Sequence, residues 1–160
     1  MPSIRLAKFL GLASVLVSGA AACQPDFAGK EVFVFVTGAW SASPIAAGSA
    51  VNWVSGNIGV PFTVTKDASQ NYSFRANNGT LAVSGSSGAL KLQKASSTDP
   101  LQKFKISCAA CGTGSNPVSY GCKFRPASNQ NNCVANGAGQ SVVVVPCTEF
   151  SPQYWHFNEV

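Results

Sequence analysis

The sequence predicts an all-β protein, and three observations lead to that prediction. After residue 22, no long stretch repeats apolar residues with the 3.6-residue period of an amphipathic helix. Short runs of β-branched and aromatic residues recur instead, separated by Gly, Pro, Ser and Asn. A unit of about 50 residues is also repeated along the chain, which is typical of folds built from copies of one supersecondary structure.

The expected strands follow one another with few residues between them. Three runs rich in Val and aromatic residues come first: EVFVFV (31–36), AVNWV (50–54) and VPFTVT (60–65). The turn sequences NNG (77–79) and SGSSG (84–88) separate the next three, which are YSFR (72–75), TLAV (80–83) and ALKLQ (89–93). The last five are KFKIS (103–107), CKFR (122–125), CVA (133–135), SVVVV (141–145) and YWHFN (154–158).

The repeated unit is clearest in residues 72–106 and 122–158. Each of these copies opens on an aromatic residue followed by Arg, and continues with a short strand, a Gly-rich turn, an apolar strand and a polar loop. Each copy closes on Gln, then any residue, then an aromatic ring. An earlier copy over 32–64 has Val60-Pro61-Phe62 in the closing position. The landmarks of the two clearer copies are Phe74-Arg75 and Phe124-Arg125 at the opening, and Gln102-Lys103-Phe104 and Gln153-Tyr154-Trp155 at the close.

A Gln-x-aromatic motif at the end of three such units resembles the repeat of the ricin B-type lectin family, and the chain is similar in particular to small secreted members from fungi. The resemblance covers residues 31–158. It implies a β-trefoil, in which three four-strand units form a short barrel capped by hairpins around a pseudo-threefold axis. It also implies that the closing rings, Phe62, Phe104 and Trp155, are buried near this axis while the Gln supports the adjoining loop.

In this family a repeat holds a sugar through an Asp near its first strand, a stacking aromatic and amide side chains. The combination suits a polyol, which offers directional hydroxyls and one apolar face. In two of the copies here both the Asp and the aromatic are missing, so the resemblance predicts no such pocket there. The two positions hold Ala135 and Val145 in the third copy, and Ala82 and Leu92 in the second.

The first copy keeps more of the pattern. Trp53 falls near the stacking position with Asn52 and Asn57 close by, although Gly38 and Trp40 lie where an upstream Asp is missing. If one repeat binds sugar, we expect this one, with Trp53 or Trp40 as the platform and Asn52 and Asn57 as hydrogen-bonding partners. The alternative is that Trp53 is a core residue. The closing Gln residues, which the second and third copies retain, complete the candidate sugar contacts: Gln102 and Gln153.

Residues 1–22 are predicted to be a secretory signal peptide. Arg5 and Lys8 precede an apolar run from 9 to 17, and Ala20 and Ala22 occupy the small-residue positions of a cleavage site. The run is shorter than the roughly 20 residues that a membrane span needs, so no span is expected.

A bacterial lipoprotein signal ending at Cys23 fits the sequence less well, because such a signal requires a large aliphatic residue where Ala20 stands. The remaining residues, 23–160, are long enough for a single domain with its own core. We therefore expect one secreted, extracellular ricin-B-like domain over 23–160.

Charge argues against a nucleic-acid partner. Without Arg5 and Lys8, nine Lys and Arg face six Asp and Glu, and the cations are scattered. Phosphate-tracking surfaces need a concentrated basic stripe instead. Charged residues make up 11% of the chain, compared with about 25% in an average globular protein, so the surface is expected to be polar through hydroxyl and amide groups.

Six cysteines behind a signal peptide predict disulfides formed in an oxidising compartment. We expect Cys133 to pair with Cys147, and Cys23 to pair with one of Cys108, Cys111 or Cys122 while the other two bond to each other. Cys108-Ala-Ala-Cys111 also has the spacing of a zinc knuckle, but the chain holds a single His and a closed zinc site needs four ligands. No metal and no cofactor are therefore expected.

Catalysis is not indicated by the sequence. The single histidine, His156, has no Ser or Cys motif that would recruit it as a base, and strand alternation turns it away from Trp155. The six carboxylates are scattered, and Glu149 alone lies near the binding region of the family.

Two sequons, Asn71-Tyr72-Ser73 and Asn78-Gly79-Thr80, are glycosylation acceptors if the host is a eukaryote. Their alternative origin is chance in a chain rich in Asn and Ser.

Two functions follow as hypotheses. The first is a secreted, non-catalytic carbohydrate-binding protein whose partner is a glycan or glycoprotein. The second keeps the fold and replaces the sugar by a protein, as in a protease inhibitor or a secreted host-interaction factor, because such loops are exposed and rigidly mounted. The missing Asp positions favour the second hypothesis, whereas the retained Gln residues and Trp53 favour the first.

Overall fold

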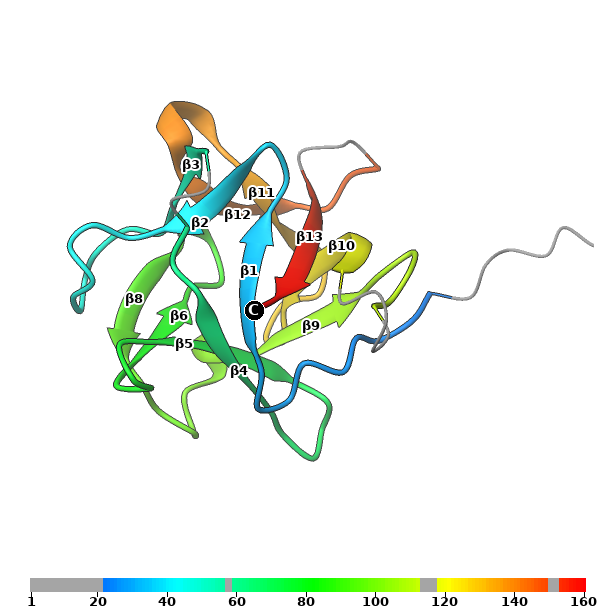
Figure 1. The fold of residues 1–160 in the computed structure, drawn as a ribbon, viewed down its shortest axis with the longest axis horizontal. Helices are drawn as coiled ribbons and strands as arrows, with labels where there is room; N and C mark the ends of the chain where they lie inside the picture. The colour runs from blue at the N-terminus through cyan, green and yellow to red at the C-terminus, as the bar shows by residue number, and fades with distance from the viewer. Residues whose placement is uncertain (1–21, 57–58, 113–117, 150–152) are drawn as a thin grey trace, which may run out of the picture.

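The computed structural model describes residues 22–56, 59–112, 118–149 and 153–160 (Figure 1). Apart from Ala22, the predicted signal peptide lies outside these residues. Within the described part of the chain, no helix is both long and apolar enough to cross a membrane.

The strands fall into three consecutive groups that match the three sequence copies, and all eleven expected strands have a counterpart. One strand, β2, was not expected, and the strand expected at 89–93 is divided into the short strands β7 and β8. The first group is β1 (Glu31–Phe35), β2 (Gly38–Ser41), β3 (Asn52–Ser55) and β4 (Phe62–Lys66). The second is β5 (Tyr72–Ala76), β6 (Leu81–Ser84), the short β7 (Gly88–Ala89), β8 (Lys91–Lys94) and β9 (Phe104–Ser107). The third is β10 (Val118–Pro126), β11 (Asn132–Asn136), β12 (Val142–Pro146) and β13 (Tyr154–Glu159).

Two strands of each group build a closed barrel. Antiparallel pairing runs from β1 to β4, β5, β9, β10 and β13, and β13 pairs with β1 again. The first and last strands of the fold therefore lie side by side, as Figure 1 shows. Closure leaves no free edge in this ring of strands, which removes a route to edge-to-edge aggregation.

Six of the other strands form three hairpins, β2–β3, β6–β8 and β11–β12, and the short β7 pairs with β12. One buried residue beside each hairpin joins it to the next through the main chain. The N–H of Val51 donates to the carbonyl of Leu90 at 2.9 Å, Leu90 to Val142 at 2.8 Å, and Val142 back to Val51 at 3.0 Å. This triangle of hydrogen bonds marks a pseudo-threefold axis. The six-strand barrel and the three hairpins around it are the arrangement that the resemblance implies.

The core is filled by aromatic rings from all three groups. Phe62, Phe104 and Trp155, the closing rings of the three copies, are each 0% exposed, as expected. Trp40 lies among them, with its ring centroid 5.1 Å from that of Trp155 and 6.1 Å from that of Phe62. Burying one such ring contributes a few kcal/mol to folding. The cluster therefore anchors all three copies to one another.

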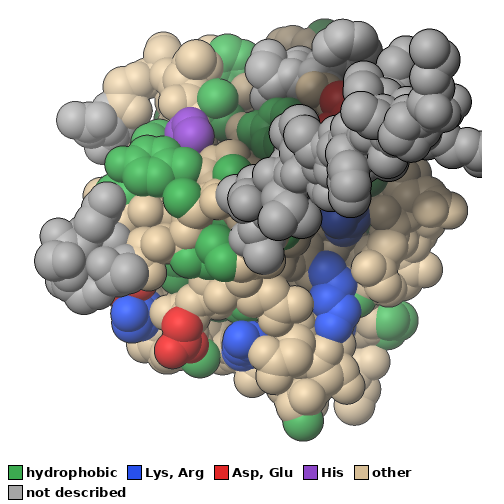
Figure 2. Space-filling view, turned by 90° about the vertical axis from the view of Figure 1, so that its right-hand side faces the viewer, with side chains coloured by type: hydrophobic (Ala, Val, Ile, Leu, Met, Phe, Trp, Pro, Cys, Tyr) green, Lys and Arg blue, Asp and Glu red, His purple; other side chains and the backbone are tan. Residues whose placement is uncertain are grey.

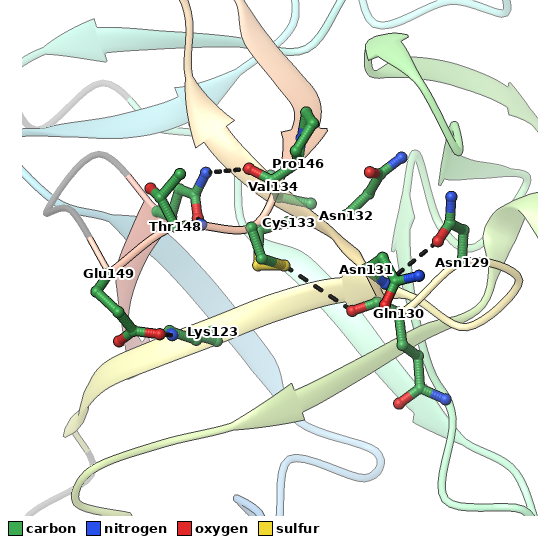
Figure 3. The surroundings of a disulfide bond; sticks show 12 residues. Lys123, Asn129, Gln130, Asn131, Asn132, Cys133, Val134, Pro146, Thr148 and Glu149 are labelled. Carbon is green, nitrogen blue, oxygen red and sulfur yellow. Dashed lines mark hydrogen bonds and ion pairs between the residues drawn. A yellow bond between two sulfur atoms is a disulfide. The ribbon is translucent and has the colours of Figure 1, made fainter.

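Three disulfides join Cys23 to Cys111, Cys108 to Cys122 and Cys133 to Cys147. The third is the pair expected from the sequence, and it ties together the two ends of the β11–β12 hairpin (Figure 3). Among the described residues, no group of three or more His, Cys, Asp and Glu side chains is arranged to hold a metal ion.

Candidate functional site

The outer face of β1 carries two large aromatic rings. Val32 and Val34 point into the barrel and are 0% exposed, so strand alternation turns Phe33 and Phe35 outward, where both are half-buried. Single apolar residues are common on protein surfaces, but two neighbouring phenylalanines on the solvent side of a strand form an apolar patch.

Strand β13 brings polar side chains beside these rings. Trp155 and Phe157 face the core, so His156 and Asn158 face outward. In the pairing of β1 with β13, Phe35 lies opposite His156 and Phe33 lies opposite Asn158. The ring centroids of Phe35 and His156 are 5.5 Å apart. The barrel wall therefore presents aromatic rings and an amide together.

A pocket of about 580 Å³ opens at this place. Its size is within the range of small-molecule sites. A Cβ at Gly59 would lie 2.5 Å from that of Ala39 and 3.3 Å from the Phe33 ring, so only glycine fits at position 59, against Ala39 of β2. None of the described residues that line it is charged: they are Phe33, Phe35, Val36, Thr37, Gly38, Ala39, Gly56, Gly59 and Asn158.

His156 borders the pocket in a partly buried position, beside a group of hydrophobic side chains in Figure 2. Its Nδ1 accepts a hydrogen bond from the N–H of Gly121 at 3.4 Å. Burial lowers the pKa of His156 from its ordinary value of 6.5, so the ring is neutral at pH 7. The site is therefore uncharged at neutral pH.

This lowered pKa predicts a loss of stability in mild acid. Because the unfolded chain binds the proton more tightly than the folded one, the stability that neutral His156 provides is complete above pH 6.5 and declines as the pH falls below it. Urea unfolding from pH 8 to pH 5 should show this decline. As the chain has one histidine, the variant H156Q should flatten the curve in this window, and equal slopes for both proteins would contradict the assignment.

The structure corrects the prediction for Trp40 and changes the expectation for Trp53. Trp40 is 0% exposed in the aromatic core, so it is unavailable to a ligand and the predicted platform role is wrong. Trp53 lies opposite Trp40 in the β2–β3 pair and is partly buried against the core. A Cβ at Gly38 would come within 3.1 Å of the Trp53 ring, which packs over that glycine. Trp53 is outside the set of residues that line the pocket.

The two predicted asparagine partners have different outcomes. Asn52 is partly buried and forms an isolated antiparallel β-bridge with Ser141 of the third copy, so it connects the hairpins of the first and third copies. It therefore lies toward the threefold axis and outside the pocket lining. Asn57 lies outside the described residues.

The closing glutamines support loops, as the resemblance implies, and are badly placed for sugar. Gln153 is 4% exposed, accepts from the N–H of Thr148 at 2.6 Å and donates to the carbonyl of Pro146 at 2.8 Å. Gln102 is 2% exposed, accepts from the N–H of Ser96 at 2.8 Å and donates to the carbonyl of Lys94 at 2.9 Å. Because both amides are buried in backbone hydrogen bonds, the structure does not support their predicted sugar contacts.

We predict that Gln153 matters for stability and not for ligand. The variant Q153L keeps a similar volume and removes both hydrogen bonds, so the free energy of unfolding should fall by about 1–3 kcal/mol. Q102L is the matched variant and should lose a similar amount. Urea unfolding measures the change. Unchanged stability together with lost ligand binding would restore the glutamine as a contact residue.

In the second and third copies, the structure keeps the family's sugar positions apolar. Ala82, Leu92 and Ala135 are buried in the core, and Val145 is partly buried. No carboxylate stands at these positions.

Glu149, the carboxylate expected near the binding region of ricin B-type lectins, already interacts with two neighbouring side chains. Its Oε1 lies 2.6 Å from Nζ of Lys123 (Figure 3), and its Oε2 accepts from the hydroxyl of Tyr154 at 2.9 Å. The hydrogen bond from Lys123, followed by that from Tyr154, lowers the pKa of Glu149, so this carboxylate is ionised at neutral pH. It lies outside the set of residues that line the pocket.

The two sequons differ in accessibility. Asn78 is exposed in the turn between β5 and β6. Asn71 is partly buried, and its Nδ2 donates to a carboxylate oxygen of Asp67 at 3.0 Å. An attached glycan therefore meets less obstruction at Asn78.

The residues that sequence reasoning missed are Phe33, Phe35 and Asn158. The signal that points to them is strand alternation in VFVFV and YWHFN. Once Val32 and Trp155 are taken as core residues, the positions between core positions must face outward.

Comparisons with known proteins support the fold and leave the family open. No protein-family model and no curated protein sequence matches this chain. A mosquitocidal holotoxin has a TM-score of 0.67 at 15% identity. The match covers 82% of this chain but only 17% of the toxin chain. A designed threefold-symmetric protein, ThreeFoil, has a TM-score of 0.63 at 11% identity, covering 81% of this chain and 99% of its own.

A third structure, described as the BEL β-trefoil, has a TM-score of 0.61 at 13% identity and covers 83% of this chain and 94% of its own. The fold is a β-trefoil. At such low identity the similarity concerns the fold alone. In this fold the last strand of the third copy lies beside the first strand of the first copy, so Asn158 joins residues of the first copy in the pocket lining.

Proposed function

We propose that this protein is a secreted, lectin-like β-trefoil that binds a neutral carbohydrate at the pocket of its first copy, without catalysing a reaction on it. The observation that carries the proposal is that Phe33 and Phe35 line an uncharged pocket together with Asn158, which lies opposite Phe33 in the strand pairing. The structural similarity to β-trefoil proteins and the Gln-x-aromatic repeats, which resemble those of ricin B-type lectins, are consistent with it.

The chemistry of the pocket suits a sugar. A pyranose ring has an apolar face of C–H groups, which packs on a phenyl ring, and hydroxyls around its edge, which pair with amide and backbone groups. Phe33 and Phe35 provide the rings, while Asn158 and Thr37 provide side-chain donors and acceptors. A charged ligand would find no opposite charge among the lining residues that the structure describes, so the proposed ligand is neutral.

The absence of catalysis is part of the proposal. Glycoside hydrolysis generally uses two carboxylates that flank the bond, and within the described part of the chain no pocket-lining residue is Asp or Glu. Secretion is supported by the three disulfides, which persist in oxidising compartments.

A glycan array of neutral saccharides, followed by titration of the best ligand, tests the proposal. The variant F35A should lower affinity roughly fivefold or more, because the loss of a stacking ring costs at least about 1 kcal/mol. Two variants serve as controls. W53A removes the aromatic that the sequence favoured, and L101A removes an exposed apolar side chain in the second copy, in the 3-10 helix η1 (Pro100–Gln102). Both controls should keep wild-type affinity.

The alternative hypothesis is that the protein binds a protein partner and not a sugar. The buried Ala82 and Ala135 favour this alternative, because they stand where ricin B-type lectins carry a sugar-binding Asp. If no neutral glycan binds at millimolar concentration, the carbohydrate proposal fails. If glycans bind equally well to wild type and F35A, but more weakly to W53A, the site moves to the hairpin.

A further inference from the structure

Strand β10 carries a β-bulge opposite His156. Ser119 pairs with Phe157 and Cys122 pairs with Trp155, so Tyr120 and Gly121 together face the single residue between. Gly121 has a φ of 59°, in the left-handed region that favours glycine. Such bulges redirect a side chain. Here Ser119 and Cys122 are 0% exposed, whereas Tyr120 is exposed by 43% and is the most exposed aromatic side chain of the described residues.

The bulge is held in place by the segment Cys108-Ala109-Ala110-Cys111. The N–H of Tyr120 donates to the carbonyl of Ala110 at 2.9 Å, and its own carbonyl accepts from the N–H of Ala109 at 3.1 Å. One disulfide ties Cys108 to Cys122 in β10, and another ties Cys111 to Cys23. The segment that resembles a zinc knuckle in sequence thus acts as a clamp. An exposed tyrosine is fixed to a cross-linked backbone, which lowers the entropy cost of using it in binding.

Tyr120 continues the aromatic surface of the candidate site. Its ring centroid is 5.3 Å from that of His156, which is in turn 5.5 Å from that of Phe35 in the pocket wall. The three rings come from β10, β13 and β1, which are neighbours in the barrel. They therefore form one row, which we call the aromatic row: Phe35, His156 and Tyr120. With His156 neutral at pH 7, the row is as uncharged as the pocket.

We propose that Tyr120 is a second sugar-stacking platform, so that the site takes a neutral oligosaccharide along the aromatic row and not a single terminal sugar. This inference rests on the proposed function. Under this proposal a sugar seated on Phe35 in the pocket is followed by further units that pass His156 and reach the exposed ring of Tyr120. The two ring contacts along this path are 5.5 and 5.3 Å between centroids, and their planes are inclined by 53° and 66°. A chain of neutral sugars matches a surface that is aromatic, uncharged and continuous with the pocket.

Chain-length titration tests the inference. The probes are one-, two- and four-unit saccharides of two neutral series, glucose with its cello-oligosaccharides and N-acetylglucosamine with its chito-oligosaccharides, measured by calorimetry. For the series that binds, affinity should rise from one unit to four. Y120A should lower the affinity for the four-unit saccharide roughly three- to tenfold and leave the single sugar unchanged. Y120F keeps the ring and should retain most of the affinity, and L101A should behave as wild type.

The outcomes separate the two proposals. If neither these probes nor any saccharide of the glycan array binds, the proposed function fails and the inference fails with it. If a probe binds in a manner that depends on Phe35, but the four-unit saccharide binds no more tightly than the single sugar or Y120A has no effect, the inference alone is overturned. A Y120A protein with a circular dichroism spectrum and unfolding midpoint like those of wild type excludes misfolding as the cause of an affinity loss.

Discussion

Replacing Trp155 by alanine is expected to lower the free energy of unfolding by about 3–5 kcal/mol. The ring is 0% exposed, packs 5.1 Å from the ring of Trp40, and donates from Nε1 to the carbonyl of Val134 at 2.8 Å. Its removal leaves a cavity at the junction of all three copies and a buried carbonyl without its partner. Guanidinium unfolding followed by circular dichroism measures the effect.

Trp155→Phe is the matched control. It keeps most of the ring and removes the hydrogen bond to Val134, so the expected loss is smaller, about 1–2 kcal/mol. A loss below about 1 kcal/mol for Trp155→Ala would show that the closing aromatic does not hold the core, and the repeat-based account of the fold would fail with it.

Removing the disulfide between Cys23 and Cys111, with both residues changed to alanine, should cost about 4.5 kcal/mol. The bond closes a loop with a sequence separation of 88, and a cross-link restricts the unfolded chain more when the loop is longer. It also fastens the N-terminal segment, whose Phe27 packs in the core with its ring 5.1 Å from that of Phe157. The midpoint of urea unfolding should shift accordingly.

The bond between Cys133 and Cys147 gives an internal comparison. Its sequence separation is 14, so its removal should cost about 3 kcal/mol. Parallel unfolding curves of the two double-alanine variants test the order of the two losses. A larger loss for the shorter loop would mean that native contacts, and not the unfolded chain, decide the stabilisation.

The fold could be predicted from the sequence because the residues that define the repeat are also residues that fill the core. The closing rings Phe62, Phe104 and Trp155 are buried in every copy, and their spacing sets the length of the unit. Strand β2 was missed because GAWS (38–41) offers little β-propensity. It becomes a strand through its pairing with β3 and the burial of Trp40.

The candidate site was less accessible, for two physical reasons. In VFVFV both faces of the strand are apolar, so alternation alone does not say whether the Val or the Phe side chains fill the barrel. The place of Tyr120 depends on a bulge, which arises from the register between β10 and β13 and leaves little trace in local sequence. Trp residues drew attention as sugar platforms, whereas the structure uses Trp40 to hold the three copies together.

The triangle formed by Val51, Leu90 and Val142 has a consequence for how such a molecule can diversify. Its contacts run through peptide groups, which every non-proline residue possesses, so the symmetry of the scaffold does not require matching side chains in the three copies. The outward-facing side chains of one copy can therefore change while the other two copies continue to support the fold. A β-trefoil can therefore carry a candidate binding site on one part of its barrel while the other copies lack one.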